Sequence, residues 1–390
     1  MGNRRRYLSF IVQLVFLFVP ICVSAFDSDI SESARSSIPP PRTDATSWLL
    51  TDVGTGMIIA AENADKRVEP ASLTKLMTAF LVFREIARGN VKLEEEVIVS
   101  EKAWQTGGSR MFIEPGDRVS VENLLLGLIV QSGNDSAVAL AEHLAGSEAG
   151  FADLMNQTSV EIGLKNTHFV NSTGLPHPDH FSTARDLSRL TRAIIQEQPA
   201  HYAYYAIPAF TWNGITQKNR NPLLDRDENV DGVKTGYTKS AGYCLIGSAD
   251  RSGTRLIATV IGASSERDRA NLVYALLKYG FAAYESHHLY GDDTVIVTVR
   301  IFKGKTDSAP AGISQGIDLL LAKGLGKELE AKVQLVEPLV APIEKGREVG
   351  TLTLQLKGEP LLSRPLVSLE SVPSGSWFSG LADSVRLWLR

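Results

Sequence analysis

Apolar positions in the first part of the chain follow two different periods. Segments 48–50 and 57–59 are apolar and flank a turn sequence at 52–56, which predicts two strands joined by a tight turn. The next apolar positions have the spacing i, i+3, i+4 and i+7, and they are Leu73, Leu76, Met77 and Phe80. This spacing predicts a helix that buries one apolar stripe against a core.

Helical and strand patterns then separate along the chain. Residues 121–130 and 137–144 predict two helices joined by a polar turn, with Asn134 or Asp135 as the N-cap of the second. The strand-like segments that follow are 233–236, 244–247 and 256–261. Together they predict an antiparallel sheet edge, followed by a helix through 270–277. We therefore expect an α/β fold of the α+β kind.

The pattern changes to alternation beyond about residue 290. The alternating apolar residues are Val295, Val297, Val299, Leu352, Leu354 and Leu356. Such alternation predicts half-buried strands, and we expect turns at Gly304, Gly350 and Gly358. Residues 293–372 should therefore form a small β-rich domain, which would serve as a stalk or as a module for a protein partner.

The N-terminal segment differs in pattern from a folded domain. Arginines, an apolar run and a small-residue cleavage site make residues 1–25 a predicted secretory signal. An uncleaved membrane anchor is the alternative, but the apolar run is shorter than the ~20 residues that span a bilayer. The neighbours of Cys22 disfavour lipid attachment there. Residues 26–46, rich in Ser and Pro, should form a flexible linker, so that the first folded domain covers 47–288.

Residues 374–390 have a separate amphipathic pattern. On a helical wheel one arc is apolar and consists of Trp377, Phe378, Leu381, Ala382, Val385, Trp388 and Leu389. Asp383 and Arg386 lie on the opposite arc and make a transmembrane orientation costly. We therefore predict a helix that lies in the plane of a membrane surface, with docking on the β-rich domain as the alternative.

Charge and cysteine content narrow the set of partners. The chain of 390 residues has a formal charge of −4, and loss of residues 1–25 removes three arginines and no acidic residue, which gives about −7. This balance argues against nucleic-acid binding. Cys244 would be the only cysteine of the mature chain, so it has no intrachain disulfide partner. Its apolar neighbours favour a buried thiol over a reactive one.

Three short motifs carry the candidate chemistry. In chain order they are Ser72-Leu-Thr-Lys75, Ser132-Gly-Asn134 and Lys234-Thr235-Gly236. Each alone is a weak signal, but together they describe a serine acyl-transferase site. Ser72 would be the nucleophile, and Lys75, on the same helical turn, the base that takes its proton. A lysine is normally protonated at neutral pH, so burial and repulsion from Lys234 must lower the pKa of Lys75.

The remaining motif residues would serve the leaving group and the substrate. Ser132 is expected to relay the proton to the departing amine. Asn134 would hold a substrate amide, while Lys234 and Thr235 would bind a terminal carboxylate. Gly236 would let the substrate backbone approach the strand closely.

The motifs and their surroundings resemble low-molecular-mass penicillin-binding proteins, the serine-type D-alanyl-D-alanine carboxypeptidases. The stretches that resemble the family are 70–75, 163–167, 182–187, 212–221 and 229–236. The resemblance covers essentially the whole mature chain. It implies a β-lactamase/transpeptidase-like domain with an antiparallel sheet and helices, followed by the β-rich domain. It also implies an enzyme that removes the terminal D-Ala from peptidoglycan stem pentapeptides through an acyl-enzyme on Ser72 and that binds penicillin covalently.

The resemblance assigns residues outside the catalytic triplets as well. Arg220 and Arg269 match family positions near the substrate carboxylate, with surface salt bridges as the alternative for each. Many relatives have histidine where this chain has Tyr237, a position that lends its backbone N–H, with that of Ser72, to the oxyanion hole. The backbone donor is retained, so acylation should be retained, while the effect of the tyrosine side chain on turnover stays open.

Other functions share parts of this pattern. A class A β-lactamase needs a Glu-x-x-Leu-Asn element, and the segment 161–166 has one residue too many. A zinc hydrolase would need H-E-x-x-H spacing. The clustered histidines lack that spacing, and they are His177, His180, His287 and His288. We therefore expect no metal and no cofactor. An endopeptidase would use the same acylation chemistry, whereas an inactive peptidoglycan-binding scaffold would not need the intact motif set.

Export and a membrane-binding C-terminus together predict the location. The protein should act at the periplasmic face of the inner membrane, held there peripherally by residues 374–390. The expected partners are peptidoglycan stem peptides, β-lactam antibiotics and the membrane surface.

Overall fold

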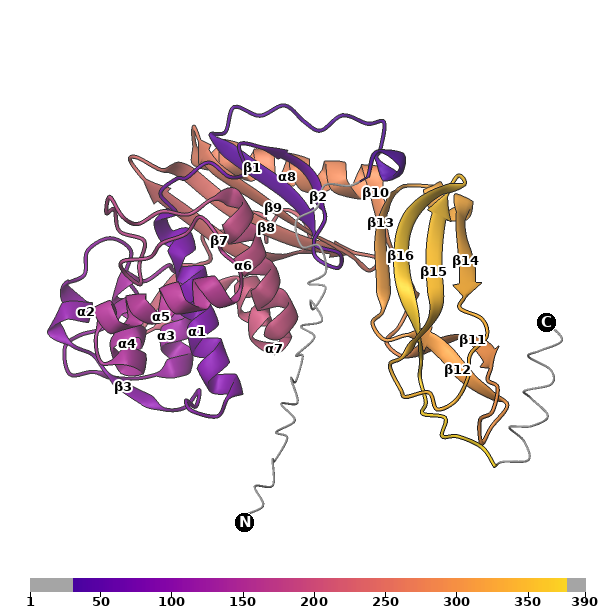
Figure 1. The fold of residues 1–390 in the computed structure, drawn as a ribbon. Helices are drawn as coiled ribbons and strands as arrows, with labels where there is room; N and C mark the ends of the chain where they lie inside the picture. The colour runs from indigo at the N-terminus through magenta and orange to yellow at the C-terminus, as the bar shows by residue number, and fades with distance from the viewer. Residues whose placement is uncertain (1–30, 377–390) are drawn as a thin grey trace, which may run out of the picture.

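A computed structural model describes residues 31–376, and Figure 1 shows that they form two parts. The first part combines a sheet with helices, and the second consists mainly of strands. The signal predicted at 1–25 and the apolar arc predicted from residue 377 onward lie outside the described residues. Within residues 31–376, no helix has the length and apolar character needed to cross a bilayer.

The first part is built on a five-stranded antiparallel sheet. Its strands are β1 (Ser47–Asp52), β2 (Ile58–Glu62), β7 (Val230–Thr238), β8 (Gly242–Arg251) and β9 (Thr254–Ala263). They lie in the order β2-β1-β9-β8-β7, so β7 is an edge strand. The strand–turn–strand predicted at 48–59 is confirmed. The three segments predicted to form a sheet edge are antiparallel strands, but only β7 lies at the edge, because β8 and β9 pair on both sides.

The helices of the first part are α1 (Lys75–Ala87), α2 (Glu101–Gln105), α3 (Val121–Val130), α4 (Asn134–Ala145), α5 (Glu148–Glu161), α6 (Ala184–Glu197), α7 (Pro199–Tyr202) and α8 (Glu266–Ala283). Helix α8 packs on one face of the sheet and α6 on the other (Figure 1). Alternate residues of β9 point to opposite faces: Leu256 and Val260 join the core under α8, whereas Ile257 joins the core of the other helices. The sheet therefore separates two apolar cores.

Short elements complete the first part. The small strands are β3 (Glu96–Ile98), β4 (Arg118–Ser120), β5 (Ala209–Trp212) and β6 (Ile215–Lys218), paired β3 with β4 and β5 with β6. The 3-10 helices of the described chain are η1 (Glu32–Ala34), η2 (Ala71–Thr74) and η3 (Ala203–Ala206), with η4 (Leu325–Glu328) in the second part. Of these, η2 leads directly into α1 and matters most, because it carries Ser72.

The helix predicted to bury one stripe is buried on almost all sides. In α1 every residue from Lys75 to Phe83 is buried, including Thr78 and Ala79 outside the predicted stripe. The reason is tertiary, since α1 contacts α3, α4, α5 and α6. A helix surrounded by other helices needs no polar face over its central turns.

The second part contains another five-stranded sheet and a strand pair. The sheet strands are β11 (Thr294–Arg300), β12 (Ser308–Ile313), β14 (Leu329–Leu335), β15 (Glu348–Leu356) and β16 (Glu359–Ser368), in the order β11-β12-β16-β15-β14. The pair consists of β10 (Tyr284–Tyr290) and β13 (Ile317–Ala322). Residues 284–288, which the sequence pattern assigns to the first domain, thus pair with a strand of the second part.

The predicted alternation is confirmed in β15 and only partly in β11. In β15 the three predicted leucines are buried, and they are Leu352, Leu354 and Leu356. In β11 Val299 is buried, but Val295 is 54% exposed. A bulge between Val295 and Val297 shifts the register with β12, which interrupts the two-residue period.

One of the predicted turns is wrong. Gly358 follows β15 with a φ of 84° and lies in the β15–β16 turn, as predicted. Gly350 instead lies inside β15, where it pairs with Leu335. A Cβ at Gly350 would come within 2.5 Å of the Gln334 carbonyl oxygen, so this glycine allows close strand packing and does not form a turn.

The described part of the predicted linker has defined contacts. Ala34 is buried, the Ser36 N–H donates to the Tyr284 hydroxyl, and the Tyr279 hydroxyl donates to the Ile38 carbonyl. These bonds hold residues 31–46 against α8 and β10.

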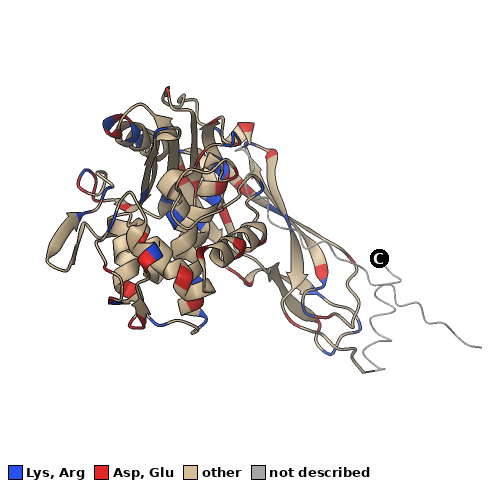
Figure 2. Cartoon of the chain, turned by 90° about the vertical axis from the view of Figure 1, so that its left-hand side faces the viewer, with Lys and Arg blue, Asp and Glu red and all other residues tan. Residues whose placement is uncertain are grey.

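Basic and acidic residues are interspersed over both parts (Figure 2). Some form ion pairs between helices, as Arg84 of α1 does with Glu161 of α5 and Glu197 of α6. Partly exposed pairs of this kind contribute about 1 kcal/mol or less each, so the apolar cores hold the helices together.

Candidate active site

The Ser72-Leu-Thr-Lys75 motif forms the turn that leads into α1. Pro70 precedes η2, and its restricted φ favours the start of a helical turn. Ser72 is half-buried, and Lys75 is fully buried one turn later. Lys75 Nζ lies 3.2 Å from Ser72 Oγ, within hydrogen-bond distance. The structure therefore brings the candidate nucleophile and the candidate base together.

Two further acceptors orient the amine of Lys75. It donates to Asn134 Oδ1 at 2.6 Å and to the backbone carbonyl of Thr173 at 2.7 Å. A neutral amine has two hydrogens and one lone pair. With its hydrogens on Asn134 and Thr173, its lone pair is directed at Ser72 Oγ, whose hydroxyl then donates. These two acceptors thus leave the lone pair of a neutral Lys75 facing Ser72 Oγ.

Burial and then repulsion from Arg220 lower the pKa of Lys75 to about 7, against the attraction of Asp135. Arg220 is thus the repelling charge that acts on the pKa of Lys75, while the predicted repulsion between the two lysines acts on the pKa of Lys234. Burial also holds the pKa of Lys234 well below its usual range, with repulsion from Lys75 as the next cause. A substantial fraction of Lys75 is therefore deprotonated near neutral pH.

The Ser132-Gly-Asn134 motif forms the connection between α3 and α4. Helix α4 begins at Asn134 with Gly133 as its N-cap, so the predicted N-cap at Asn134 or Asp135 is wrong. The side chain of Asn134 is used elsewhere, because it accepts from Lys75 and donates from Nδ2 to the Gly107 carbonyl at 2.5 Å. Asn134 is the first residue inside the helix, and its side chain links Lys75 to the loop at Gly107.

Ser132 has a backbone conformation that non-glycine residues rarely adopt. Its φ is 65°, and strained positions of this kind cluster at functional sites. Its Oγ is buried and has no hydrogen-bond partner within residues 31–376. A buried hydroxyl is normally paired, so this one is available to a bound substrate.

Asp135, the residue directly after this motif, anchors the loop at 107–112. Its buried carboxylate accepts hydrogen bonds from the backbone N–H groups of Met111 and Phe112, each at 3.0 Å. The Asn134 N–H adds a bond to the Ser109 carbonyl at 2.7 Å. The loop at 107–112 is thereby fixed to the start of α4.

The Lys234-Thr235-Gly236 motif lies on the edge strand β7. Lys234 and Thr235 are buried, and Lys234 Nζ donates to the Thr235 carbonyl at 3.1 Å. A Cβ at Gly236 would lie 3.3 Å from the Ala71 Cβ. The close approach that glycine permits here is therefore between β7 and the turn that carries Ser72. The free edge of β7 leaves backbone groups available to an extended ligand.

These elements surround a cavity of about 660 Å³. Its lining residues are Ser72, Gly108, Ser109, Ser132, Arg220, Thr235, Gly236, Tyr237, Tyr243, Glu266 and Arg269. The other predicted residues, Lys75, Asn134 and Lys234, lie buried behind this lining.

The two arginines taken from the resemblance both line the cavity. Arg220 is exposed, whereas Arg269 is only 5% exposed. Arg269 donates to the Gly236 carbonyl at 3.1 Å, so it also fixes the edge strand. Tyr237 is 53% exposed, and its ring packs against Tyr243 with centroids 4.4 Å apart.

Comparison with known proteins identifies the family. Residues 34–265 match the D-alanyl-D-alanine carboxypeptidase family. The chain belongs to this family. Residues 284–374 match a second family, the C-terminal domain of penicillin-binding protein 5. The protein is accordingly a carboxypeptidase, a hydrolase of the penicillin-binding type, as the motifs predict.

Individual relatives cover nearly the whole carboxypeptidase. D-alanyl-D-alanine carboxypeptidase DacC of Escherichia coli (strain K12) is 40% identical over 381 residues, which span 96% of this chain and 93% of DacC. Penicillin-binding protein 5 from Haemophilus influenzae aligns with a TM-score of 0.82 and 36% identity over 86% of this chain and 100% of that one. Penicillin-binding protein D2 from Listeria monocytogenes, solved in an ampicillin-bound form, has a TM-score of 0.58 and 31% identity over 62% of this chain and 100% of that one. The predicted fold is confirmed.

The carboxypeptidase site contains groups that the motifs do not reveal. Asp135 holds the loop at 107–112, and Tyr243 and Glu266 line the cavity. The position of Asp135 directly after the second motif is a signal that could have identified it. Thr173 contributes only a backbone carbonyl, so no side-chain pattern could have pointed to it.

The residues that could have indicated a metal site, a reactive thiol or a β-lactamase element are held by contacts within the fold. His180 accepts from the Val170 N–H through Nδ1, so its Nε2 carries the hydrogen that it donates to Thr74 Oγ1 at 2.8 Å. Burial lowers the pKa of His180 to about 4. Burial also raises the pKa of the Cys244 thiol to about 11, which agrees with the predicted inert cysteine. Glu161 forms an ion pair between α5 and α1 and does not line the cavity.

Proposed function

We propose that this carboxypeptidase removes the terminal D-Ala from peptidoglycan stem pentapeptides through an acyl-enzyme on Ser72. The observation that carries the proposal is the 3.2 Å contact between Lys75 Nζ and Ser72 Oγ, with the amine fully buried. Burial lowers the pKa of Lys75 to about 7, so the neutral base is present at the working pH.

Acylation begins when Lys75 takes the proton of Ser72 Oγ. The oxygen attacks the carbonyl carbon of the D-Ala-D-Ala amide, and the backbone N–H groups of Ser72 and Tyr237 stabilise the oxyanion. The first turn of η2 and the free edge of β7 support these two donors, because both leave N–H groups without partners in their own element.

The C–N bond then breaks, and Ser132 passes the proton from Lys75 to the departing D-Ala amine. The buried Ser132 hydroxyl, without a partner in the described chain, supports this relay. Lys75 is then neutral again and activates a water molecule, which hydrolyses the Ser72 ester. The products are free D-Ala and the shortened stem peptide, and the enzyme returns to its starting protonation state.

Substrate binding is assigned to the cationic side of the cavity. Lys234, Thr235 and Arg220 would bind the terminal carboxylate, while Arg269 holds β7 in place through the Gly236 carbonyl. A bound carboxylate favours the ammonium form of Lys234, which offsets the lowering of its pKa by burial. The Nδ2 hydrogen of Asn134 that Gly107 does not use would hold a substrate amide.

A β-lactam should acylate the same serine. Its ring amide resembles the D-Ala-D-Ala bond, and its carboxylate would bind at Lys234 and Thr235. The related penicillin-binding protein D2 was solved with ampicillin bound, which supports this assignment.

Intact-protein mass spectrometry after exposure to benzylpenicillin tests the site. We expect an increase equal to the mass of the antibiotic, on a peptide that contains Ser72, and no increase in Ser72→Ala. Incubation with a stem pentapeptide should release free D-Ala from wild type alone. An adduct on another residue, or an adduct in Ser72→Ala, contradicts the assignment.

We further propose export and membrane attachment. Residues 1–25 would direct export, and a C-terminal helix would bind the periplasmic face of the inner membrane peripherally. The domains would be 47–283 and 284–374, with the boundary moved to the start of β10, since β10 pairs with β13 and the second family match begins at residue 284.

A further inference from the structure

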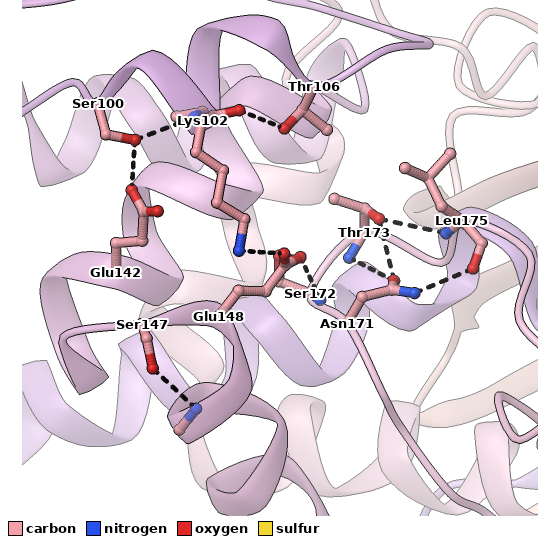
Figure 3. Close-up of polar contacts among 12 residues, drawn as sticks. Ser100, Lys102, Thr106, Glu142, Ser147, Glu148, Asn171, Ser172, Thr173 and Leu175 are labelled. Carbon is pink, nitrogen blue, oxygen red and sulfur yellow. Dashed lines mark hydrogen bonds and ion pairs between the residues drawn. The ribbon is translucent and has the colours of Figure 1, made fainter.

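The backbone turn that holds Lys75 has its own internal support. Thr173, whose carbonyl accepts from Lys75, belongs to a turn over residues 171–175. Asn171 Oδ1 accepts from the N–H groups of Thr173 at 3.2 Å and Gly174 at 2.7 Å. Asn171 Nδ2 donates to the Leu175 carbonyl at 3.0 Å, and Figure 3 shows Asn171 bonded to Thr173 and Leu175.

The same turn packs directly on the nucleophile turn. Gly174 has a φ of 84°, and a Cβ there would lie 1.8 Å from the Ala71 carbonyl oxygen. Ala71 is the neighbour of Ser72 in η2. Small movements of the turn at 171–175 would therefore change the surroundings of both the nucleophile and the base.

A carboxylate outside the cavity lining anchors this turn. Ser172 is fully buried, and its N–H and Oγ donate to Glu148 Oε1 at 3.2 and 2.9 Å. The Ser172 carbonyl accepts from Thr78 Oγ1 of α1 at 2.7 Å. The other oxygen of Glu148, at the start of α5, pairs with Lys102 Nζ of α2 at 3.0 Å. Figure 3 shows Glu148 between Lys102 and Ser172.

We propose that Glu148 is a positioning residue for Lys75. By holding Ser172 it sets the place of the Thr173 carbonyl, and this carbonyl directs the lone pair of Lys75 toward the nucleophile. A carboxylate suits this task because one oxygen accepts two bonds from Ser172 while the other meets an ammonium. The inference rests on the proposed role of Lys75 as the base.

A positioning role has a signature that a merely structural role lacks. The negative end of the Thr173 carbonyl favours the ammonium form of Lys75, so displacing it lowers the pKa of Lys75. The acid limb of the acylation profile should then move to lower pH, while the plateau falls because the lone pair has lost its direction. A simple loss of folded protein would lower the plateau and leave the limb in place.

Other charged groups around Lys75 stay unchanged in the test. They are Asp135 of α4, Lys234 of β7, Arg220 and His180. Within residues 31–376 none of them forms a hydrogen bond or ion pair with Glu148, whose charged partner there is Lys102.

The experiment measures acylation of the full-length protein by benzylpenicillin as a function of pH. The variants are Glu148→Ala, Glu148→Gln and the matched control Glu142→Gln. Glu142 is a neighbouring carboxylate of α4 that accepts from Ser100 Oγ at 2.6 Å and, in the described chain, does not contact the turn at 171–175 (Figure 3). Mass spectrometry gives the rate, and thermal unfolding with titration of active sites gives the folded fraction.

We expect Glu148→Ala to lower the plateau rate by about tenfold, since small misplacements of a catalytic group are costly. Its acid limb should move down by roughly half a pH unit, because a stabilising dipole near the ammonium is lost. Glu148→Gln retains an acceptor for Ser172 and should show shifts of the same sign and smaller size. Glu142→Gln should match wild type.

A reduced plateau with an unmoved acid limb in both Glu148 variants overturns the proposal, as does an equal shift in Glu142→Gln. If Glu148→Ala does not fold, Glu148→Gln decides the question. Absence of a Ser72 adduct in wild type would instead contradict the proposed function, so the two failures are distinguishable.

Discussion

At the scale of single residues, the proposed acylation depends on whether the buried amine of Lys75 carries a proton. Burial is the main cause that lowers the pKa of Lys75 to about 7, and Arg220 adds to it. Because the pKa is depressed, the base form is lost as the pH falls below 7. The acylation rate should therefore reach half its plateau near pH 7 and fall about tenfold for each pH unit below.

Arg220→Ala tests the second cause of this pKa. Removing a repelling charge should raise the pKa of Lys75 and move the half-point of the acylation profile to higher pH. Acylation by benzylpenicillin between about pH 5 and pH 9 measures the half-point in both proteins. An unmoved half-point, with only weaker antibiotic binding, would mean that Arg220 does not act on Lys75.

Substitution of Lys75 and of Lys234 should affect different sets of substrates. Lys75→Ala should abolish acylation by any substrate, because no base remains. For a diacyl D-Ala-D-Ala peptide with a free carboxylate, Lys234→Ala should remove about 2 kcal/mol of transition-state stabilisation, which lowers kcat/KM roughly thirtyfold. The same substitution should lower kcat/KM much less for the peptide whose C-terminal carboxylate is replaced by an amide. Equal losses on acid and amide would show that Lys234 does not bind the carboxylate.

At the scale of elements, the site depends on how closely three segments approach one another. The turn at 171–175 and strand β7 both pack on η2, and a glycine makes each contact possible: Gly174 against Ala71, and Gly236 against Ala71. The position of η2 is therefore set by its neighbours, and the catalytic pair moves with it.

Gly174→Ala tests this packing, with Gly146→Ala as the matched control. Both glycines have positive φ, 84° and 71°, but an added Cβ meets the Ala71 carbonyl at position 174 and nothing within 4 Å at position 146. Each substitution should lower the free energy of unfolding by about 1 kcal/mol, because alanine disfavours the left-handed backbone conformation. The clash in Gly174→Ala should lower the free energy of unfolding by a further ~2 kcal/mol or more. This variant should also lose most of its acylation rate. Thermal unfolding and acylation assays compare the two, and equal effects would contradict this account.

At the scale of the whole molecule, the C-terminal segment should set location without affecting chemistry. The Gly375 N–H donates to the Lys303 carbonyl at 2.8 Å, and Ser374 bridges Gly304. Residues 374–376 therefore belong to the β-rich part, and a truncation should begin at residue 377, beyond the start predicted from the amphipathic pattern.

Deletion of residues 377–390 should release a protein that no longer floats with liposomes containing anionic lipid. Turnover of a small diacyl D-Ala-D-Ala peptide should stay within about twofold of full length, because an in-plane helix binds the membrane and residues 377–390 contain none of the candidate site residues. Aspartate at positions 377 and 381 should have the same effect by interrupting the apolar arc. Equal flotation of full-length and truncated protein would place the anchor elsewhere, at an uncleaved N-terminus.

The sequence alone determined most of the elements and the family, and it supplied the candidates for the reacting groups. Local spacing encodes local structure, so the strand–turn–strand at 48–59, the helix at 121–130 and the alternation in β15 follow from neighbouring residues. The order of the three motifs likewise predicts the chemistry, because nucleophile and base lie within one helical turn.

Tertiary structure decided what those groups experience. Lys75 and its acceptor Thr173 are 98 positions apart in sequence, and Lys75 and Asn134 are 59 apart, so only the packing of α1 among other helices brings them together. That packing removes water from the amine and thereby lowers its pKa. It also directs the Asn134 amide to Lys75 instead of the helix cap. The spacing of apolar residues predicts which side chains are buried. The contacts that orient those side chains and shift their pKa values come from segments distant in sequence.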